Sequence, residues 1–367
     1  MTPKLRIAVV GCGQIAQWQH LPSLLDHPEA QVCCVCDTDQ HRREQAARAS
    51  GAEAVIAFEQ VLASNVDAVL IATHDLSHAE LVELALRAGK HVFVEKPLAL
   101  ETAAAERILA LAVEMGLVVA VGFQRLHDPV LNRMASLLET VGRIGVVHMH
   151  DFCHRNESVI SESLPRALTD PAFTRRRSDF GDSKRWRALA ADLFPGHQAN
   201  MLDTYRLVLN LACHDLSALV YLLGEPASVD YVDMWPELFG VILWRFDQAR
   251  GVLEFGQTGR MWFDEQLRVI GNDGTLEARW ATPFVAGIPT ELHIRRMVDD
   301  VDTTVRERFT HRSLFRAEVW DFVNRITEES GRDASLENAV IVTRWLERAI
   351  LHHVERLASA DCGEQLL

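Results

Sequence analysis

The sequence lacks two features that would direct it to a membrane or to nucleic acid: a long unbroken apolar run and an excess of positive charge. The longest apolar stretch, residues 108–121, is interrupted by Glu114 and is too short to span a bilayer. The formal net charge is −14, which argues against general nucleic-acid binding. The opening "MTPKLRIAVVG" enters a predicted strand at once, with no signal peptide before it. We therefore expect a cytoplasmic protein that binds neither membranes nor nucleic acid.

Cysteines are present, but their spacing suggests neither a disulfide framework nor a metal site. There are seven of them, an odd number without a repeating pattern. Cys33, Cys34 and Cys36 fall within one apparent strand, "VCCVC", and no His or Cys partner follows nearby. We expect these residues to be small buried hydrophobes, and we expect no bound metal.

The order of predicted elements indicates two domains of different architecture. A chain of 367 residues is too long for one ordinary core. In the first third, apolar strands alternate with amphipathic helices, which predicts a Rossmann-type α/β domain with a doubly wound parallel sheet over residues 1–124. Residues 125–367 contain several strands joined by short turns and end in helices at about 311–328 and 335–357. These predict an α+β domain with a large, mostly antiparallel sheet, for substrate binding and oligomerisation.

A glycine-rich motif follows the first predicted strand. "GCGQIA", residues 11–16, matches G-x-G-x-x-A at the opening of a helix. Gly11 permits the tight turn, Gly13 lets the backbone approach a pyrophosphate, and Ala16 allows close helix–strand packing. Because backbone N–H groups at the start of a helix bind phosphate, the motif predicts a dinucleotide site that includes Gln14 and Ile15.

The second predicted strand ends at Asp37, 24 residues after Gly13. A carboxylate at this position accepts hydrogen bonds from both ribose hydroxyls of NAD and repels the 2′-phosphate of NADP. Arg42 and Arg43 follow closely and could hold that phosphate. We expect NAD, with NADP less favoured.

A longer stretch carries a family resemblance. "ATHDLSHAELVELALRAGKHVFVEKPLA", residues 72–99, resembles the Gfo/Idh/MocA family of glucose–fructose oxidoreductases and inositol 2-dehydrogenases. "GFQRLHDP" (122–129), the hairpin at 264–280 and the closing helices are similar to the same family. The resemblance covers nearly the whole chain apart from about residues 155–200.

The resemblance implies specific roles for side chains. Lys96 would lie beside the nicotinamide and stabilise charge on the reacting oxygen, after a cis Lys96–Pro97 bond. His214 would exchange the hydroxyl proton. In "NLACH" the family's catalytic-helix Asp is replaced by Asn210, which can only position the imidazole. The implied cofactor contacts include Thr73, His74, His78, Glu95, Lys96 and Gln124.

Together these features predict an enzyme, an NAD(P)-dependent oxidoreductase acting on a sugar or cyclitol hydroxyl or ketone, with an anionic sugar derivative as one option. We expect a homodimer or homotetramer formed through the C-terminal sheet. Two alternatives on the same scaffold stay open: an NAD-retaining lyase or glycosidase, and a non-catalytic nucleotide-binding regulator. A plain hydroxy-acid dehydrogenase should lack the second sheet domain.

One segment departs from the acidity of the chain. Residues 155–187 contain eight basic and five acidic residues, a net charge of +3. The pattern suggests either a solvated surface excursion, an oligomer contact, or an arm that overhangs the substrate cleft and attracts an anionic substrate.

Overall fold

The computed structural model describes residues 3–154, 188, 191, 205–235, 239–258, 263–285, 287–310, 313–328 and 334–364. The basic segment at 155–187 lies outside the described residues, so the hypotheses about it stay untested. The chain divides into two compact units. The first is Met1–His127 with Ser313–Thr343, and the second is Asp128–Arg312 with Arg344–Leu367.

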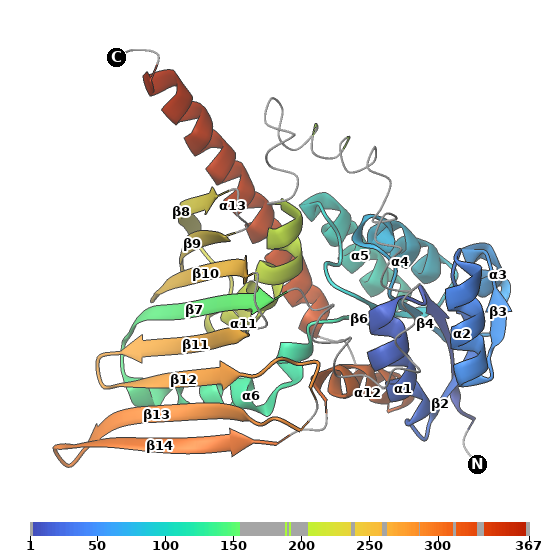
Figure 1. The fold of residues 1–367 in the computed structure, drawn as a ribbon, viewed down its shortest axis with the longest axis horizontal. Helices are drawn as coiled ribbons and strands as arrows, with labels where there is room; N and C mark the ends of the chain where they lie inside the picture. Colours follow the sequence, from blue (N-terminus) through green and yellow to red (C-terminus); the bar gives the residue numbers. More distant parts are fainter. Residues whose placement is uncertain are drawn as a thin grey trace. The chain divides into compact units, whose positions relative to one another are not determined.

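The first unit contains the predicted Rossmann sheet, which is confirmed. Six parallel strands lie in the order β3-β2-β1-β4-β5-β6 (Figure 1). Their bounds are β1 (Leu5–Val10), β2 (Ala30–Cys36), β3 (Glu53–Val55), β4 (Ala68–Ile71), β5 (His91–Val94) and β6 (Val119–Val121). The helical segments are η1 (Ala16–His20), α1 (Leu21–Leu25), α2 (Gln40–Ser50), α3 (Phe58–Ala63), η2 (Asp75–Ser77), α4 (His78–Arg87), α5 (Thr102–Met115), η3 (Gln124–His127) and α12 (Leu314–Thr327).

Burial on both faces explains why the strands read as continuous apolar runs. All four residues of β4 and the last four of β1 are buried, as expected for a parallel sheet covered by helices on both sides. Because all six strands are parallel, their carboxyl ends emerge at one edge of the sheet, where ligands of such folds bind.

The boundary between units differs from the predicted division at residue 124. Helix α12 comes from the C-terminal part of the chain but packs in the first unit. Val319, Phe322 and Val323 are fully buried in the same hydrophobic cluster as Phe93 and Val9. Apolar burial in this cluster assigns the helix to the Rossmann unit, although its sequence follows the second sheet.

The second unit contains the predicted large, mostly antiparallel sheet. Its eight strands lie in the order β14-β13-β12-β11-β7-β10-β9-β8, and only the β7–β10 pair is parallel. The bounds are β7 (Ile144–His154), β8 (Ser228–Trp235), β9 (Phe239–Arg245), β10 (Arg250–Thr258), β11 (Asp264–Gly271), β12 (Gly274–Trp280), β13 (Thr290–Val298) and β14 (Val301–Phe309). The described helical segments are α6 (Pro129–Leu137), η4 (Leu138–Val141), η6 (Val208–Ala212) and α11 (Cys213–Leu223); α13 (Ala334–Glu364) begins in the first unit and ends in the second.

A buried carboxylate ties α6 to this sheet. Asp128 is fully buried and accepts hydrogen bonds from Trp280 Nε1 at 3.1 Å and Thr290 Oγ1 at 2.7 Å. Its other oxygen caps the helix by accepting from Val130 N at 3.0 Å. The start of α6 is thereby fixed against β12 and β13.

The continuous helical stretch Tyr205–Leu223 is long and apolar enough, by length and composition alone, to cross a membrane. Of its most apolar window, 67% is buried inside the protein, a pattern that a core helix also gives. Tyr205 and Leu216 are fully buried within the described part of the chain.

Candidate active site

The glycine loop after β1 shows two different reasons for glycine. Gly11 has φ +85°, and a Cβ added there would lie 2.5 Å from the carbonyl oxygen of Ala72, in the segment after β4. The fold itself therefore requires Gly11. A Cβ on Gly13 would meet no described atom within 4 Å. The chain leaves open space at Gly13, which fits the close approach of a pyrophosphate.

Asp37 lies directly after β2 and faces this loop. Its Oδ2 accepts from the backbone N–H of Cys12 at 2.7 Å, and its Oδ1 accepts from Asp39 N at 2.8 Å. Arg43 Nη1 donates to the Asp37 carbonyl oxygen. The carboxylate thus supports the glycine loop, and its remaining lone pairs are available to ribose hydroxyls.

Arg42 lies in the first turn of α2. Its backbone N–H donates to Oδ1 of Asp39, the residue that caps this helix, at 3.0 Å. Two arginines of α2 and the carboxylates of Asp37 and Asp39 thus lie close together in the sequence after β2.

The described cysteines are free thiols. Cys34 and Cys36 are buried, as expected, and so is Cys12 in the glycine loop, but Cys33 is only half-buried, contrary to the expectation. Burial, followed by the charge of Asp37, raises the pKa of Cys36 to about 11. The same two causes raise the pKa of Cys12. Both thiols are therefore protonated at neutral pH and lack nucleophilic character.

The turn after β5 carries Lys96. The Lys96–Pro97 peptide bond is cis, as the resemblance implied. The backbone N–H of Lys96 donates to Glu95 Oε2 at 3.2 Å. His78 is 1% exposed; its Nδ1 lies 2.8 Å from the Pro97 carbonyl oxygen and its Nε2 lies 3.2 Å from that of Thr73. His78 thus links the turn of Lys96 to the segment after β4.

Other predicted cofactor contacts lie nearby in the same unit. Thr73 Oγ1 is 2.8 Å from Ser77 Oγ, and His74 directly precedes the η2 turn. Gln124 is 4% exposed at the start of η3. Gln14 and Ile15 form the start of the helix after the glycine loop. Thr73 and His74 follow β4 and Gln124 follows β6, so they lie after the carboxyl ends of strands in the same parallel sheet as β1.

The predicted proton-transfer residues lie in the second unit. Asn210 is exposed within η6, a π-helical turn, and its Nδ2 donates to the Arg206 carbonyl oxygen at 2.9 Å. His214 is 8% exposed in the first turn of α11. Asn210 and His214 are four residues apart, a spacing that places two side chains on one face of a regular α-helix, and the π turn that contains Asn210 departs from that regular geometry.

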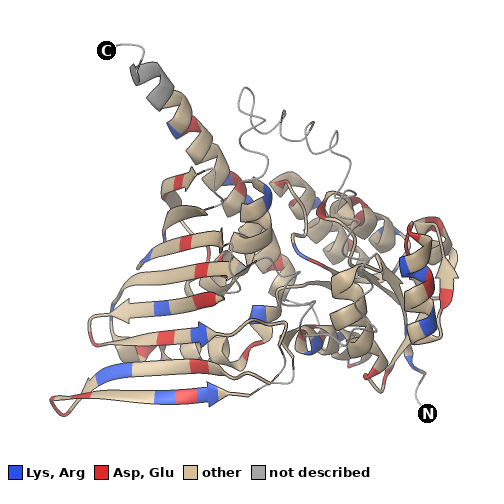
Figure 2. Ribbon diagram, in the orientation of Figure 1, with Lys and Arg blue, Asp and Glu red and all other residues tan. Residues whose placement is uncertain are grey.

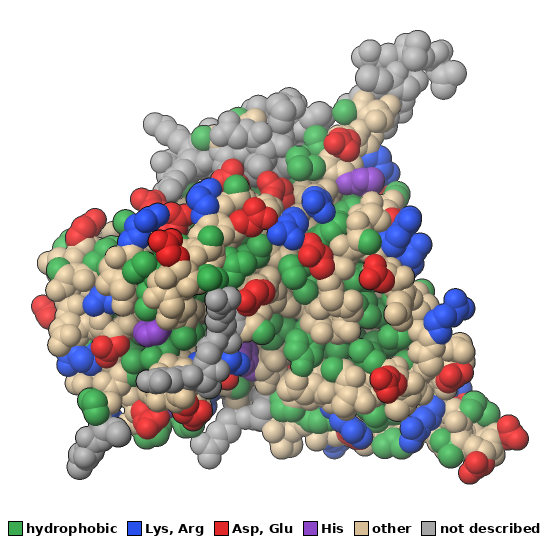
Figure 3. Space-filling model, turned by 180° about the vertical axis from the view of Figure 1, so that it is seen from behind, with side chains coloured by type: hydrophobic (Ala, Val, Ile, Leu, Met, Phe, Trp, Pro, Cys, Tyr) green, Lys and Arg blue, Asp and Glu red, His purple; other side chains and the backbone are tan. Residues whose placement is uncertain are grey.

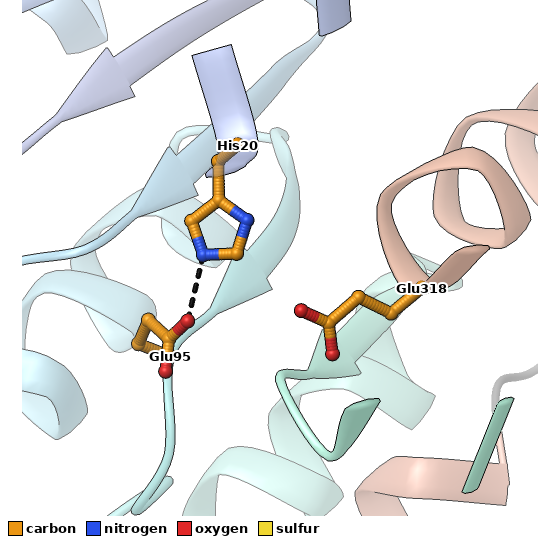
Figure 4. Close-up of side chains that lie close together, drawn as sticks. All are labelled: His20, Glu95 and Glu318. Atoms are coloured by element: carbon orange, nitrogen blue, oxygen red, sulfur yellow. Dashed lines mark hydrogen bonds and ion pairs between the residues drawn. The ribbon is translucent and has the colours of Figure 1, made fainter. Parts of the chain in front are cut away.

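Two buried groups of ligand-type side chains were not predicted. One consists of His20, Glu95 and Glu318; the other consists of Asp151, Asp215 and Glu265. Within each group the donor atoms lie within 4.8 Å of one another. Figure 4 shows the first group: the Glu318 carboxylate from α12 faces the pair formed by His20 and Glu95. No local sequence pattern indicates either group, since their members are far apart along the chain.

Comparison with known proteins agrees with this architecture. Residues 5–123 match the Gfo/Idh/MocA model, described as an oxidoreductase family with an NAD-binding Rossmann fold. The Rossmann domain belongs to this family. The family resemblance predicted from residues 72–99 is thus confirmed.

Two relatives whose names give different activities match parts of this chain. A dTDP-3,4-didehydro-2,6-dideoxy-alpha-D-glucose 3-reductase from Actinomadura kijaniata is 36% identical over 144 residues, which cover 39% of this chain and 43% of that protein. An inositol 2-dehydrogenase from Burkholderia cenocepacia is 35% identical over 187 residues, covering 50% and 54%. The chain spans about half the length of the curated relatives that it matches.

The solved structures extend the likeness to the second unit. The crystal structure of KijD10, a 3-ketoreductase from Actinomadura kijaniata in complex with NADP, has a TM-score of 0.71 and 21% identity. It covers 94% of this chain and 96% of that one. At this identity the match establishes a shared fold, including the large second sheet.

Proposed function

We propose that this protein is an NAD(P)-dependent oxidoreductase acting on a sugar or cyclitol hydroxyl or ketone. One observation carries the proposal: the glycine loop, Asp37 and the Lys96 turn follow β1, β2 and β5 of one parallel sheet. Their side chains and backbone amides therefore emerge at the same sheet edge, where dinucleotides bind. The open space at Gly13 supports this placement.

The chemistry divides among the chain's own residues. A bound nicotinamide dinucleotide would supply the hydride acceptor or donor. The Lys96 ammonium would stabilise negative charge on the substrate oxygen. His214 would accept the hydroxyl proton in oxidation and return it in reduction. Asn210 is neutral, so it can orient a ring nitrogen but cannot stabilise an imidazolium charge as Asp would.

The substrate class rests on relatives as well as on this chemistry. One named relative reduces a keto group of a dTDP-linked sugar and another oxidises inositol. The substrates of both relatives contain a secondary alcohol or the corresponding ketone. Lys96 and a proton donor could support the oxidation or reduction of such a group. We propose that the substrate of this chain is of the same chemical class.

Two features bear on the choice between NAD and NADP in opposite directions. The Asp37 carboxylate favours the free ribose hydroxyls of NAD. The guanidinium groups of Arg42 and Arg43 could pair with a 2′-phosphate. KijD10 was solved with NADP. Dissociation constants for NAD and NADP, measured on the same preparation, decide between them.

Turnover assays test the proposal. The purified protein would be mixed with NAD or NADP and a panel of aldoses, inositols and dTDP-linked sugars, and with NADH or NADPH and the matching ketones. We expect stoichiometric formation or consumption of free NAD(P)H with at least one substrate. Turnover without net NAD(P)H release would instead identify an enzyme that retains its cofactor. Tight cofactor binding without any turnover would favour a regulator.

We also propose self-association through the second sheet. The last strand, β14, is exposed or half-buried along its whole length. Met297, Val301 and Val305, on and beside it, are 59%, 58% and 51% exposed. Figure 3 shows hydrophobic side chains on the surface among charged ones. Light scattering of the wild type and of a Val301→Asp, Val305→Asp variant tests this: we expect a dimer or tetramer that the variant weakens.

A further inference from the structure

His20 is a buried residue that the sequence did not single out. It ends η1, the π-helical turn that follows the glycine loop, and it is fully buried. Its Nε2 lies 2.6 Å from Glu95 Oε1 (Figure 4). The imidazole therefore reaches the residue directly before Lys96 from the helix that begins at the predicted pyrophosphate site.

The charge state of Glu95 fixes the direction of this hydrogen bond. Burial raises the pKa of Glu95, but the hydrogen bond and charge of His20, followed by the charges of Lys96 and His78, outweigh burial and lower the pKa. Glu95 is thus a carboxylate at neutral pH and can only accept. Nε2 of His20 must carry the proton and donate it.

The second oxygen of Glu95 completes the chain of contacts. Oε2 accepts from the backbone N–H of Lys96 at 3.2 Å. One carboxylate therefore connects the His20 imidazole to the peptide unit from which the Lys96 side chain extends.

Packing restricts both His20 and Glu95. The imidazole meets Phe93 edge-on, with ring centroids 5.3 Å apart, and also contacts Phe315 at 6.3 Å. A Cβ added to Gly122 would lie 3.4 Å from the carboxyl carbon and from both oxygens of Glu95, an ordinary van der Waals separation. Gly122 therefore lies next to the Glu95 carboxylate with no side chain between them.

We propose that His20 is a positioning residue for Lys96. His20 holds the carboxylate of Glu95 in one orientation, and Glu95 in turn holds the Lys96 peptide. Because His20 stands on the helix of the glycine loop, the same contact fixes the lysine relative to the cofactor-binding loop. This inference rests on the proposed function, in which Lys96 contacts the reacting oxygen.

A metal ion is the competing occupant of this site. The donor atoms of His20, Glu95 and Glu318 are close enough to share one ion. However, two ligands of one tetrahedral zinc ion lie about 3.4 Å apart, given metal–ligand bonds of about 2.1 Å. The 2.6 Å separation of Nε2 and Oε1 is that of a charge-assisted hydrogen bond instead.

The test compares three single variants. His20→Leu removes the donor and keeps an apolar side chain. His20→Gln places an amide N–H donor near the position of Nε2. His27→Leu is the matched control: His27 is also buried, but it packs edge-on against Trp320 at 4.7 Å and has Nε2 3.1 Å from Asn324 Oδ1, so these partners lie on α12 and not at Glu95.

We expect His20→Leu to lower kcat by about 10- to 100-fold, the effect of displacing a catalytic group by up to about 1 Å. The dissociation constant of the cofactor should change less than about threefold, equivalent to under about 1 kcal/mol. His20→Gln should recover much of the lost kcat. His27→Leu should lower thermal stability without a comparable loss of kcat.

A double-variant cycle gives a second measurement, which also serves if His20→Leu fails to fold. Because His20 and Glu95 act through one hydrogen bond, the double variant His20→Phe, Glu95→Gln, in which Phe keeps an aromatic ring but removes the donor, should lose less kcat than the product of the single losses. Multiplicative losses would overturn the inference. So would an unchanged kcat in His20→Leu, or activity that is lost on chelation and restored by a divalent metal. If the wild type itself has no NAD(P)-dependent turnover, the proposed function fails, which is a separate result.

Discussion

Substitution of Gly13 by alanine separates cofactor binding from folding. The added Cβ would meet no described atom within 4 Å, and Gly13 does not have a positive φ. The protein alone should accept the methyl group, with a stability change within about 1 kcal/mol that could be favourable, since alanine reduces the entropy of the unfolded chain. A pyrophosphate bound against the loop should clash with this methyl group, so cofactor binding should weaken.

The magnitude follows from the contacts that the methyl group would displace. A backbone N–H that donates to a charged oxygen contributes about 1.5–3 kcal/mol. Loss of one such bond weakens binding by about 10- to 150-fold, at about 1.4 kcal/mol for each tenfold change. NAD and NADP share the pyrophosphate, so both should be weakened by a similar factor. Titration calorimetry with each cofactor measures this.

Gly11→Ala is the contrasting variant. Its Cβ would lie 2.5 Å from the Ala72 carbonyl oxygen, at a φ of +85°. A left-handed conformation costs a non-glycine residue about 1–2 kcal/mol, and overpacking costs about 1–3 kcal/mol. We therefore expect Gly11→Ala to lower the melting temperature and Gly13→Ala to leave it nearly unchanged. If Gly13→Ala binds both cofactors as tightly as the wild type, the loop is not the pyrophosphate site.

Three further variants test other parts of the site and fold. Asp37→Asn keeps an acceptor for the Cys12 N–H but removes the charge, so the ratio of NADP to NAD affinity should rise about tenfold; an unchanged ratio would show that Asp37 does not face the ribose. Lys96→Ala and His214→Ala should each lower kcat by at least about 100-fold with little change in cofactor affinity, and a normal kcat would remove that residue from the mechanism. Asp128→Ala should lower the melting temperature, because Trp280 and Thr290 each lose their buried acceptor, at about 1–3 kcal/mol for each donor left unsatisfied; a change below about 1 kcal/mol would contradict this.

The sequence predicts the Rossmann sheet well because local patterns determine it. Each strand that is buried on both faces is a short apolar run. Gly11, which permits a tight turn, and Asp37, a charged residue after an apolar run, indicate where two of these strands end. Strands β13 and β14 were not predicted, since charged residues interrupt the apolar pattern of both strands (Figure 2). They turn at Asp299 and Asp300, with φ of 50° and 62°, a hairpin turn for which Asn-Gly or Asp-Gly is the usual signal.

Helix α12 illustrates a limit of a different kind. Its amphipathic pattern predicts a helix, but it does not say against which sheet the apolar face packs. The contacts that decide this join residues almost 300 positions apart: Trp320 Nε1 donates to the Ser23 carbonyl oxygen, and Asn324 meets His27. These are tertiary contacts, and the local periodicity of the sequence does not predict them.

The two described π-helical turns explain why the positions of His20 and His214 were harder to predict from the sequence than those of Gly11 and Gly13. A π turn inserts one residue, so the side chains that follow it leave the face predicted by a 3.6-residue period. His20 ends η1, and Asn210 lies within η6, which directly precedes the α11 helix that carries His214. In each unit, the π turn contains or directly precedes a residue proposed for proton transfer or for the positioning of Lys96. Because such turns cost regular helical hydrogen bonding and are frequent at functional sites, their positions support these assignments independently of the side-chain chemistry.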